Sequence, residues 1–187
     1  MLEIGLYVGA GIVVLVLLAM LIGFCISPKG KVIYSREISA DVSDIFEQIN
    51  DLTTWQQWSA WSPERMKGYV SSFEGPGSGV GQVWIWKETK YPGRIEITES
   101  ENNQRIVYEL SMDMFPDPMV STIRFTEREG ATFVEWENDV NWGTNPLGRL
   151  MGSIFGKMSL VGAMKFGLQS LERRGADSSG PLEADSV

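Results

Sequence analysis

The sequence contains no histidine, and its one cysteine, Cys25, lies inside an apolar segment. Without histidine the chain can form neither a Ser-His nor a Cys-His nucleophile pair, and it lacks the most common metal ligand. A single cysteine excludes an intramolecular disulfide, so the redox compartment cannot be inferred from cysteine pairing. The acidic residues show no metal-ligand spacing either. We therefore expect no metal site and no cofactor.

Positive charge is scarce and dispersed along the chain. The 187 residues include 16 Lys and Arg against 24 Asp and Glu, which gives a net charge of −8. A protein that binds nucleic acid usually presents a basic face, so we expect no nucleic-acid partner. The glycines between residues 75 and 81 are not followed by the lysine and helix of a phosphate-binding loop, and they predict a turn.

Charged residues are also missing from residues 4–26. As a helix this segment is about 35 Å long, which exceeds the roughly 30 Å hydrocarbon core of a bilayer. The alternative is a cleaved signal peptide, which would have a basic start, a shorter apolar stretch and a small-x-small cleavage site. Here only Glu3 precedes the run, and large residues such as Phe24 end it. We predict a transmembrane anchor over residues 1–27 that contacts the lipid bilayer through residues 4–26.

The charges that flank this segment predict its orientation. Lys29, Lys31 and Arg36 follow the apolar run, whereas Glu3 precedes it. Because Lys and Arg accumulate on the cytoplasmic side, we expect a single-pass protein of the cell membrane with its domain in the cytoplasm. A GxxxG pair in the span is common in apolar helices, so the oligomeric state stays open.

Residues 28–174 have the pattern of one domain. A first strand is expected at residues 31–39, followed by a helix whose apolar residues form one face, namely Val42, Ile45, Phe46 and Ile49. Turn signals then separate six expected strands, at residues 66–74, 80–88, 93–101, 104–114, 119–129 and 131–141. Short connections favour an antiparallel meander. A long helix from Asn145 to Arg174 closes the domain, and residues 175–187 are predicted to be a disordered tail.

The C-terminal helix has an unusual distribution of small and bulky residues. At about 100° per residue, small residues including Gly152, Gly156 and Gly167 form one stripe. The opposite arc is bulky and contains Leu147, Met151, Ile154, Met158, Val161, Met164 and Leu168. We expect the bulky arc to pack on the sheet and the glycine stripe to meet another backbone, either the first helix and the link after it or a second copy of the chain. Arg149, Lys157 and Lys165 spiral around the helix, so they predict neither a second span nor a basic membrane-binding face.

Three segments match the pattern of a known family. They read W-Q-Q-W-S-A-W-S-P from Trp55, F-E-G-P-G-S-G-V-G-Q-V-W-I-W from Phe73 and R-I-V-Y-E-L from Arg105. With the order strand, helix, strand meander and long helix, residues 31–174 resemble the polyketide cyclase/dehydrase-like branch of the START/Bet v1 (SRPBCC) superfamily. The resemblance implies an α+β helix-grip fold, in which a curved antiparallel sheet wraps around the C-terminal helix with an apolar cavity between them. It also implies a hydrophobic ligand such as a lipid, quinone or polyketide-like molecule.

Candidate ligand contacts are the large apolar or isolated polar side chains expected on inward faces or beside the cavity. Tryptophans offer apolar area, methionine gives an adaptable lining, and a polar group in an apolar pocket can orient a ligand. The predicted set is Trp55, Trp58, Trp61, Trp86, Glu99, Tyr108, Met112 and Trp136. Ordinary core packing produces the same alternation, so the sequence alone does not separate a cavity lining from a core.

Three functions are compatible with these features. The first is a membrane-tethered binder or carrier of a hydrophobic small molecule. The second is a cyclase- or dehydrase-type enzyme, which would need a polar pair inside the cavity, with Arg36, Glu99 and Tyr108 as the candidates. The third is an interaction protein whose cavity is filled by its own side chains, since the chain has seven tryptophans. No catalytic residue is assigned.

The anchor can be tested by fractionation. We expect the full chain to sediment with membranes and to resist carbonate extraction, and deletion of residues 1–26 to release a soluble, folded domain. A reporter fused after Val187 should behave as cytoplasmic. Recovery of a mature chain that begins near Ser27 would instead identify a cleaved signal peptide.

Overall fold

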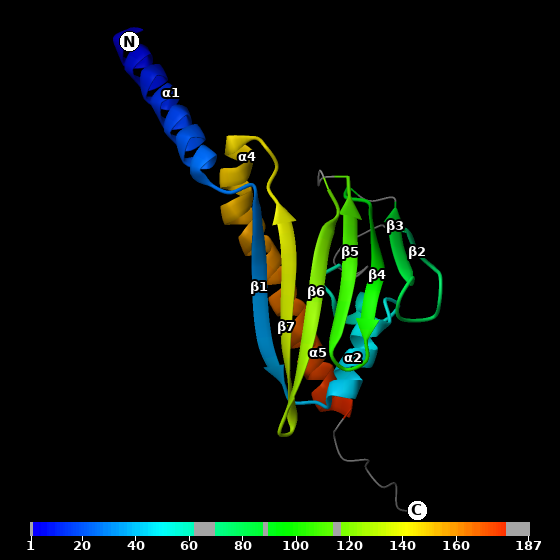
Figure 1. Cartoon of the computed structure of the whole chain (residues 1–187). Helices are drawn as coiled ribbons and strands as arrows, with labels where there is room; N and C mark the ends of the chain where they lie inside the picture. Colours follow the sequence, from blue (N-terminus) through cyan, green and yellow to red (C-terminus); the bar gives the residue numbers. More distant parts are fainter. Residues whose placement is uncertain (1, 62–69, 88–89, 114–116, 179–187) are drawn as a thin grey trace, which may run out of the picture.

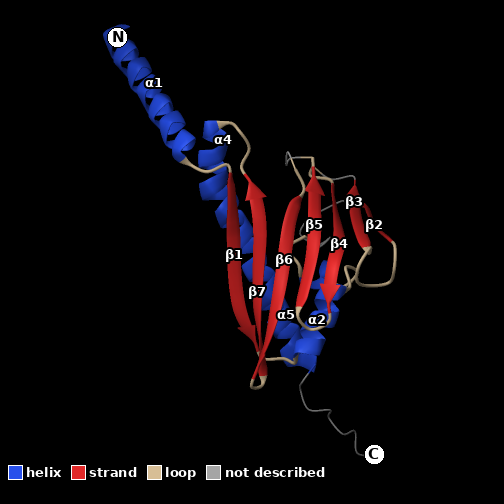
Figure 2. Cartoon of the chain, in the orientation of Figure 1, coloured by secondary structure: helices blue, strands red, loops and turns tan. Residues whose placement is uncertain are grey.

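An apolar helix, α1 (Leu2–Cys25), projects from one end of an α+β domain (Figure 1). The computed structural model describes residues 2–61, 70–87, 90–113 and 117–178. Among the helices in these ranges, α1 is the one long and apolar enough to cross a membrane, over Glu3–Cys25. A curved antiparallel sheet holds the C-terminal helix against one of its faces (Figure 2). The predicted α+β helix-grip architecture is therefore confirmed.

The sheet contains seven strands in the order β1-β7-β6-β5-β4-β3-β2. Their bounds are β1 Lys29–Ile38, β2 Val70–Glu74, β3 Val83–Lys87, β4 Gly93–Glu101, β5 Arg105–Met112, β6 Met119–Arg128 and β7 Ala131–Asn141. All neighbours pair antiparallel. Strands β2 to β7 form the expected meander. Strand β1 lies at the edge of the sheet and pairs with β7, from Lys29 opposite Asn141 to Ile38 opposite Thr132.

The structure differs from the sequence-based expectation at β3 and in the aromatic link. Strand β3 begins at Val83 rather than at residue 80, because Gly79 and Gly81 have positive φ angles of 76° and 86° that belong to a turn. A short helix, α3 (Trp55–Trp58), lies in the aromatic link and was not predicted. Residues 66–69, 88 and 114, which were assigned to strands, lie outside the described residues.

Helix α2 (Val42–Asn50) buries the apolar face that its spacing predicted, made of Val42, Ile45, Phe46 and Ile49. Phe46 meets Phe125 of β6 edge-on, with ring centroids 5.6 Å apart. The inward faces of the strands follow the predicted alternation as well, with Ile106, Tyr108 and Leu110 buried along β5 and Val134, Trp136 and Val140 along β7. Period-two patterning therefore places the core correctly.

The C-terminal helix is continuous but changes its winding near its start. It consists of α4 (Pro146–Met151), a π-helical turn η1 (Gly152–Gly156) and α5 (Lys157–Ser178). Asn145 caps it as predicted, because its side-chain oxygen accepts from the backbone N–H groups of Leu147 and Gly148 at 2.9 and 3.2 Å. The helix ends four residues beyond Arg174, at Ser178. The disorder predicted for the tail remains untested, and residues 179–187 lie outside the described residues.

The bulky arc of this helix does not face one direction, which corrects the sequence-based expectation. Met164 and Leu168 are buried against the sheet as predicted, whereas Leu147, Met151, Ile154 and Met158 are exposed. A π turn closes i→i+5 instead of i→i+4, so it adds one residue and rotates all later residues by roughly a quarter turn. A constant step of about 100° cannot anticipate this rotation.

The glycine stripe meets tryptophan rings rather than another backbone. A Cβ on Gly152 would lie 2.5 Å from Cε3 of Trp142, and a Cβ on Gly156 would lie 2.6 Å from Cζ3 of the same ring. Gly167 lies between Trp58 and Trp136, whose ring atoms would be 3.2 and 3.3 Å from an added Cβ. The prediction of close approach is right, but the glycines approach aromatic rings instead of another backbone. The rings occupy the space that a side chain at these positions would fill.

Replacing a central tryptophan tests this packing. Trp136→Ala should lower the free energy of unfolding by about 3–5 kcal/mol, because the fully buried ring leaves a cavity between the sheet and α5. The matched control is Tyr91→Ala, an aromatic side chain that is 43% exposed and should cost less than about 1 kcal/mol. Chemical denaturation of both variants measures the difference, and equal losses would contradict the packing described here.

Candidate functional site

Four of the predicted ligand contacts pack against one another in the middle of the domain. Trp55, Trp58, Tyr108 and Trp136, which we call the aromatic cluster, are at most 1% exposed. Their ring centroids lie 4.9–6.4 Å apart, mostly in edge-on arrangements. The indole N–H of Trp136 donates to the Tyr108 hydroxyl at 3.0 Å. The cluster therefore fills the centre of the space between sheet and helix that the resemblance assigned to a cavity.

Polar groups beside the aromatic cluster satisfy one another. The Ser121 hydroxyl donates to Oδ1 of Asn138 at 2.5 Å, and Nδ2 of Asn138 donates to the sulfur of Met164 on α5 at 2.8 Å. Burial raises the pKa of the Tyr108 hydroxyl above its ordinary value of 10, although hydrogen bonds with Ser121 and Trp136 oppose this shift. Tyr108 is therefore a neutral hydroxyl at physiological pH, and it can donate or accept a hydrogen bond but not act as a phenolate base.

Three further candidates, Trp61, Trp86 and Met112, are not members of the aromatic cluster. Trp61 is half-buried against the core. Trp86 packs on Gly93 and donates from its indole nitrogen to the Tyr91 carbonyl at 2.9 Å. Trp86 and Met112 line a pocket of about 420 Å³ at the ends of β3, β4 and β5. Trp86 and Met112 therefore line the same pocket, at the edge of the domain rather than at its centre.

Glu99 faces solvent, which corrects the inward orientation predicted for it. A β-bulge between Ile97 and Glu99 shifts the register against β5, so Glu99 leaves the face that Ile95 and Ile97 share. Its carboxylate pairs with Arg105 at 2.7 Å and is 53% exposed. A bulge has no reliable signal in the alternation of apolar residues, and this explains the error.

A second pocket opens where the sheet, the C-terminal helix and the end of α1 come together. It encloses about 330 Å³ between the start of β1, the start of β6, the end of β7 and α5. Its apolar wall includes Met119, Val140, Trp142 and Leu160. The backbone N–H of Trp142 donates to the Pro28 carbonyl at 2.7 Å, which ties this wall to the segment that leaves α1. We call this cavity the anchor-side pocket.

The rim of the anchor-side pocket is polar. Lys29, Asp117, Asp139 and Asn141 contribute to its lining, and Nδ2 of Asn141 donates to the Asp117 carboxylate at 2.7 Å. Asp117 and Pro118 line both pockets, so the two cavities are neighbours along the same end of the sheet. A molecule with an apolar body and a polar end matches this distribution of side chains.

The polar residues considered for catalysis do not converge. Arg36 pairs with Glu172 of α5, and this contact raises the pKa of the guanidinium. Glu99 lies on the opposite side of β4 from the core, and Tyr108 is enclosed in the aromatic cluster. These three side chains therefore do not assemble the polar pair that the enzyme hypothesis requires.

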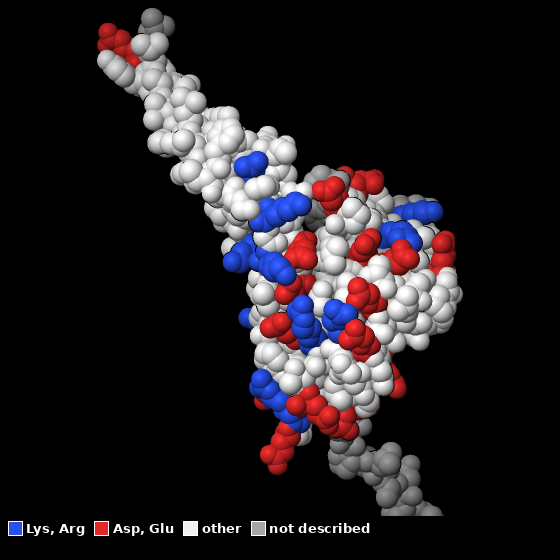
Figure 3. All heavy atoms as spheres, in the orientation of Figure 1, with Lys and Arg blue, Asp and Glu red and all other residues white. Residues whose placement is uncertain are grey.

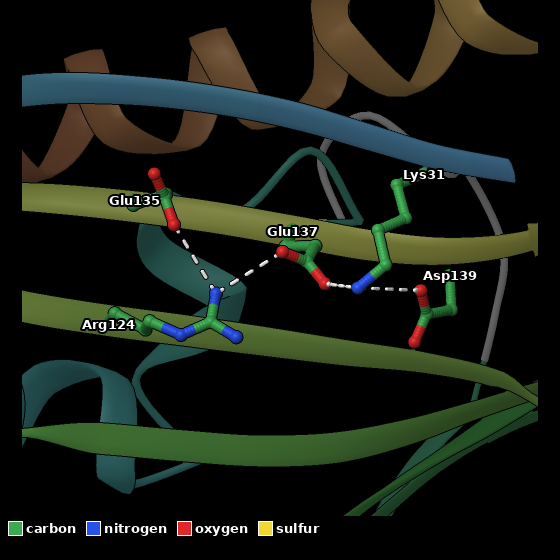
Figure 4. Close-up of polar contacts among 5 residues, drawn as sticks. All are labelled: Lys31, Arg124, Glu135, Glu137 and Asp139. Carbon is green, nitrogen blue, oxygen red and sulfur yellow. Dashed lines mark hydrogen bonds and ion pairs between the residues drawn. The ribbon is translucent and has the colours of Figure 1, made fainter.

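The outer face of the sheet carries a charged cluster of Lys31, Arg124, Glu135, Glu137 and Asp139 (Figure 4). Glu137 is its centre, since it pairs with Lys31 and, at 3.3 Å, with Arg124. The hydrogen bond from Lys31 is the main cause that lowers the pKa of Glu137 below its ordinary value, and burial opposes it. Asp139 belongs to both this cluster and the rim of the anchor-side pocket.

A family model, polyketide cyclase/dehydrase and lipid transport, matches residues 29–176. The chain belongs to this family. The match begins four residues after α1 ends, so the apolar helix is an addition outside the family domain. No curated protein matches the chain.

Solved structures with the same fold share little sequence with this family member. A protein from Thermobifida fusca superposes with a TM-score of 0.60 at 17% identity, covering 80% of this chain and 95% of its own. Aha1 from Colwellia psychrerythraea, solved as a dimer, gives 0.59 at 14% identity, with 81% and 99% covered. DynU16, a protein of the dynemicin biosynthetic locus, gives 0.55 at 15% identity, with 80% and 48% covered. At such identities the likeness establishes the fold alone.

Sequence reasoning missed most of the anchor-side pocket. Met119, Val140, Trp142 and Leu160 line it, and none of them was singled out as a ligand contact. Trp142 directly follows the last strand, and Met119 opens β6, so both mark strand ends on the side of α1. Their position at strand ends near the apolar helix was the sequence signal that could have identified them as pocket residues.

The charged cluster predicts a specific pH dependence. Because the folded pKa of Glu137 lies below its ordinary value of 4.5, its ionised form stabilises the fold above that pH, and this contribution is lost as the pH falls through the folded pKa. Glu137→Gln should lower the free energy of unfolding by about 1–3 kcal/mol at neutral pH and have little effect in strong acid. Urea denaturation across pH measures this difference.

Glu135→Gln is the control, because Glu135 shares Arg124 at the same 3.3 Å but its side chain is 38% exposed against 11% for Glu137. Its effect at neutral pH should stay below about 1 kcal/mol. A larger loss for Glu135→Gln than for Glu137→Gln would show that Lys31 does not stabilise Glu137.

Proposed function

We propose that this protein is a membrane-tethered binder or carrier of a hydrophobic small molecule, which it holds in the anchor-side pocket. The observation that carries the proposal is the position of this pocket: Lys29 and Gly30, four and five residues after the end of α1, line it. A ligand that partitions into the bilayer is concentrated at the membrane surface, where such a pocket would meet it. The domain is proposed to face the cytoplasm, since Lys29, Lys31 and Arg36 follow the span.

The chemistry of the pocket favours an amphipathic ligand. Met119, Val140, Trp142 and Leu160 offer an apolar wall, and Lys29, Asp117 and Asp139 contribute charged groups to the lining. The volume of about 330 Å³ is at the low end of the range for small-molecule sites, which suits one chain or a small ring system. Membership of a family of cyclases, dehydrases and lipid transporters supports a hydrophobic ligand, such as a lipid, quinone or polyketide-like molecule.

Photo-crosslinking in a bilayer tests the proposal. The full chain in lipid nanodiscs would be irradiated with a diazirine-bearing fatty acid, and cross-linked peptides would be located by mass spectrometry. We expect adducts on β6, β7 and α5 at the pocket lining, together with adducts on α1 from the bulk lipid. The adducts on α1 serve as an internal control for membrane insertion.

Two variants on neighbouring positions of α5 separate pocket binding from general lipid contact. Leu160→Trp should fill the pocket and reduce the pocket adducts by at least about tenfold, the equivalent of about 1.4 kcal/mol. Ser159→Trp, at an exposed position one residue earlier, should leave them unchanged. If both variants and the parent chain give adducts on α1 alone, the protein does not bind this ligand class in the pocket, and the filled-cavity interaction hypothesis gains support.

A further inference from the structure

The first half of the C-terminal helix exposes a row of large apolar side chains. They are Leu147, Met151, Ile154, Phe155 and Met158, exposed by 37%, 54%, 49%, 56% and 67%, and we call them the apolar face. Their spacing of four, three, one and three residues keeps them on one side of the helix. Exposed apolar patches of this kind on a folded domain mark a surface that contacts something other than water.

The other side of the same segment is already occupied. Gly152 and Gly156 pack on the ring of Trp142, which lines the anchor-side pocket, and Leu160 on the next turn lines it too. The π turn η1 lies between these contacts and directs the later bulky residues, such as Met164, into the core. The apolar face is therefore left over on the outside, because the winding of the helix turns it away from the sheet.

The apolar face begins beside the end of the apolar helix α1 (Figure 1). Gly23 in the last turn of α1 touches the backbone of Pro146, so closely that a Cβ on Gly23 would collide with the Pro146 carbonyl. The apolar side chains of α1 are exposed over most of its length. The apolar surface of α1 therefore lies next to the apolar face of the C-terminal helix.

Positive charge accompanies this junction. Lys and Arg side chains gather between α1 and the domain (Figure 3). Within the described ranges, the side chains of Lys29 and Lys157 have no carboxylate partner, whereas Arg149 points to the other side of the helix and donates to the Gly143 carbonyl. Cations at the margin of an apolar helical face are the composition that lies at the interface of a membrane containing anionic lipid.

We infer that the apolar face is a second membrane contact, which inserts into the headgroup and acyl boundary of the leaflet where α1 ends and seats the pocket mouth against the bilayer. This inference rests on the proposed membrane anchoring by α1. The face extends about 17 Å along the helix, whereas the interfacial layer of one leaflet is about 5–8 Å thick. A helix that stood upright would extend beyond that layer, so the contact requires the helix to tilt toward the plane of the membrane.

A second copy of the chain fits the same surface less well. Pairing two apolar faces would bring the two copies of Lys157 toward each other, and no carboxylate pairs with Lys157 within the described ranges. Anionic lipid supplies the missing negative charge. The bilayer is therefore the occupant that both the apolar side chains and the cations favour.

Depth-dependent fluorescence quenching tests the contact in the full chain. In a Cys25→Ser background, single cysteines at positions 151, 155 and 158 would carry an environment-sensitive label, in vesicles of phosphatidylcholine and phosphatidylglycerol with doxyl-labelled acyl chains. Position 15 in α1 is the control for insertion. Position 129, in the β6–β7 turn and exposed, is the control for a part of the domain without apolar surface.

We expect quenching at positions 15, 151, 155 and 158 and none at 129. Quenching at 15 with none at 155 and 158 would overturn the inference while leaving the anchor and the proposed function intact. A lack of quenching at 15 would overturn the anchor itself, and the inference with it. Disulfide cross-linking between copies at position 155, without lipid quenching there, would identify a second copy as the occupant and would also overturn it.

Discussion

The contact on which the rest of this fold depends is the packing of tryptophan rings against glycines of the C-terminal helix. Gly167 lies between Trp58 of the link and Trp136 of β7, so one contact joins the helix, the sheet and the segment after α2. The same kind of packing recurs near the start of the C-terminal helix, where the ring of Trp142 covers Gly152 and Gly156. Without side chains at these positions the helix can approach the sheet closely, and the rings supply the buried apolar area that stabilises it.

This packing also decides where a ligand can be held. The aromatic cluster occupies the centre of the space between sheet and helix, and its polar atoms are hydrogen-bonded to one another. Free volume remains at the end of the sheet that joins α1, in the pocket whose lining includes Trp142 and Leu160. In this member of the family the centre of the domain is thus filled by side chains, and the proposed ligand site lies at its edge.

The two faces of the sheet differ in polarity. The inner face is nearly all apolar, and the outer face near β1 and β7 carries the charged cluster centred on Glu137. Asp139 links that cluster to the pocket rim, so the electrostatics of the outer face reach the place where a polar ligand end would lie. Glu137 is the one member of the cluster that is largely shielded from water, with its side chain 11% exposed, whereas the side chains around it are 38–58% exposed.

The sequence by itself determined the helix-grip order, the inward residues of β5 to β7, the apolar face of α2, the cap at Asn145 and the length of the apolar helix. Each of these follows from a local period, a cap or a run of composition that acts within a few residues. Only the tertiary structure decided that Glu99 faces out, that the aromatic cluster fills the centre, and that the pocket lies beside α1. The bulge shifts the register of a strand, the π turn rotates the helix, and the packed rings fill the interior. All three depend on contacts between segments far apart in the chain.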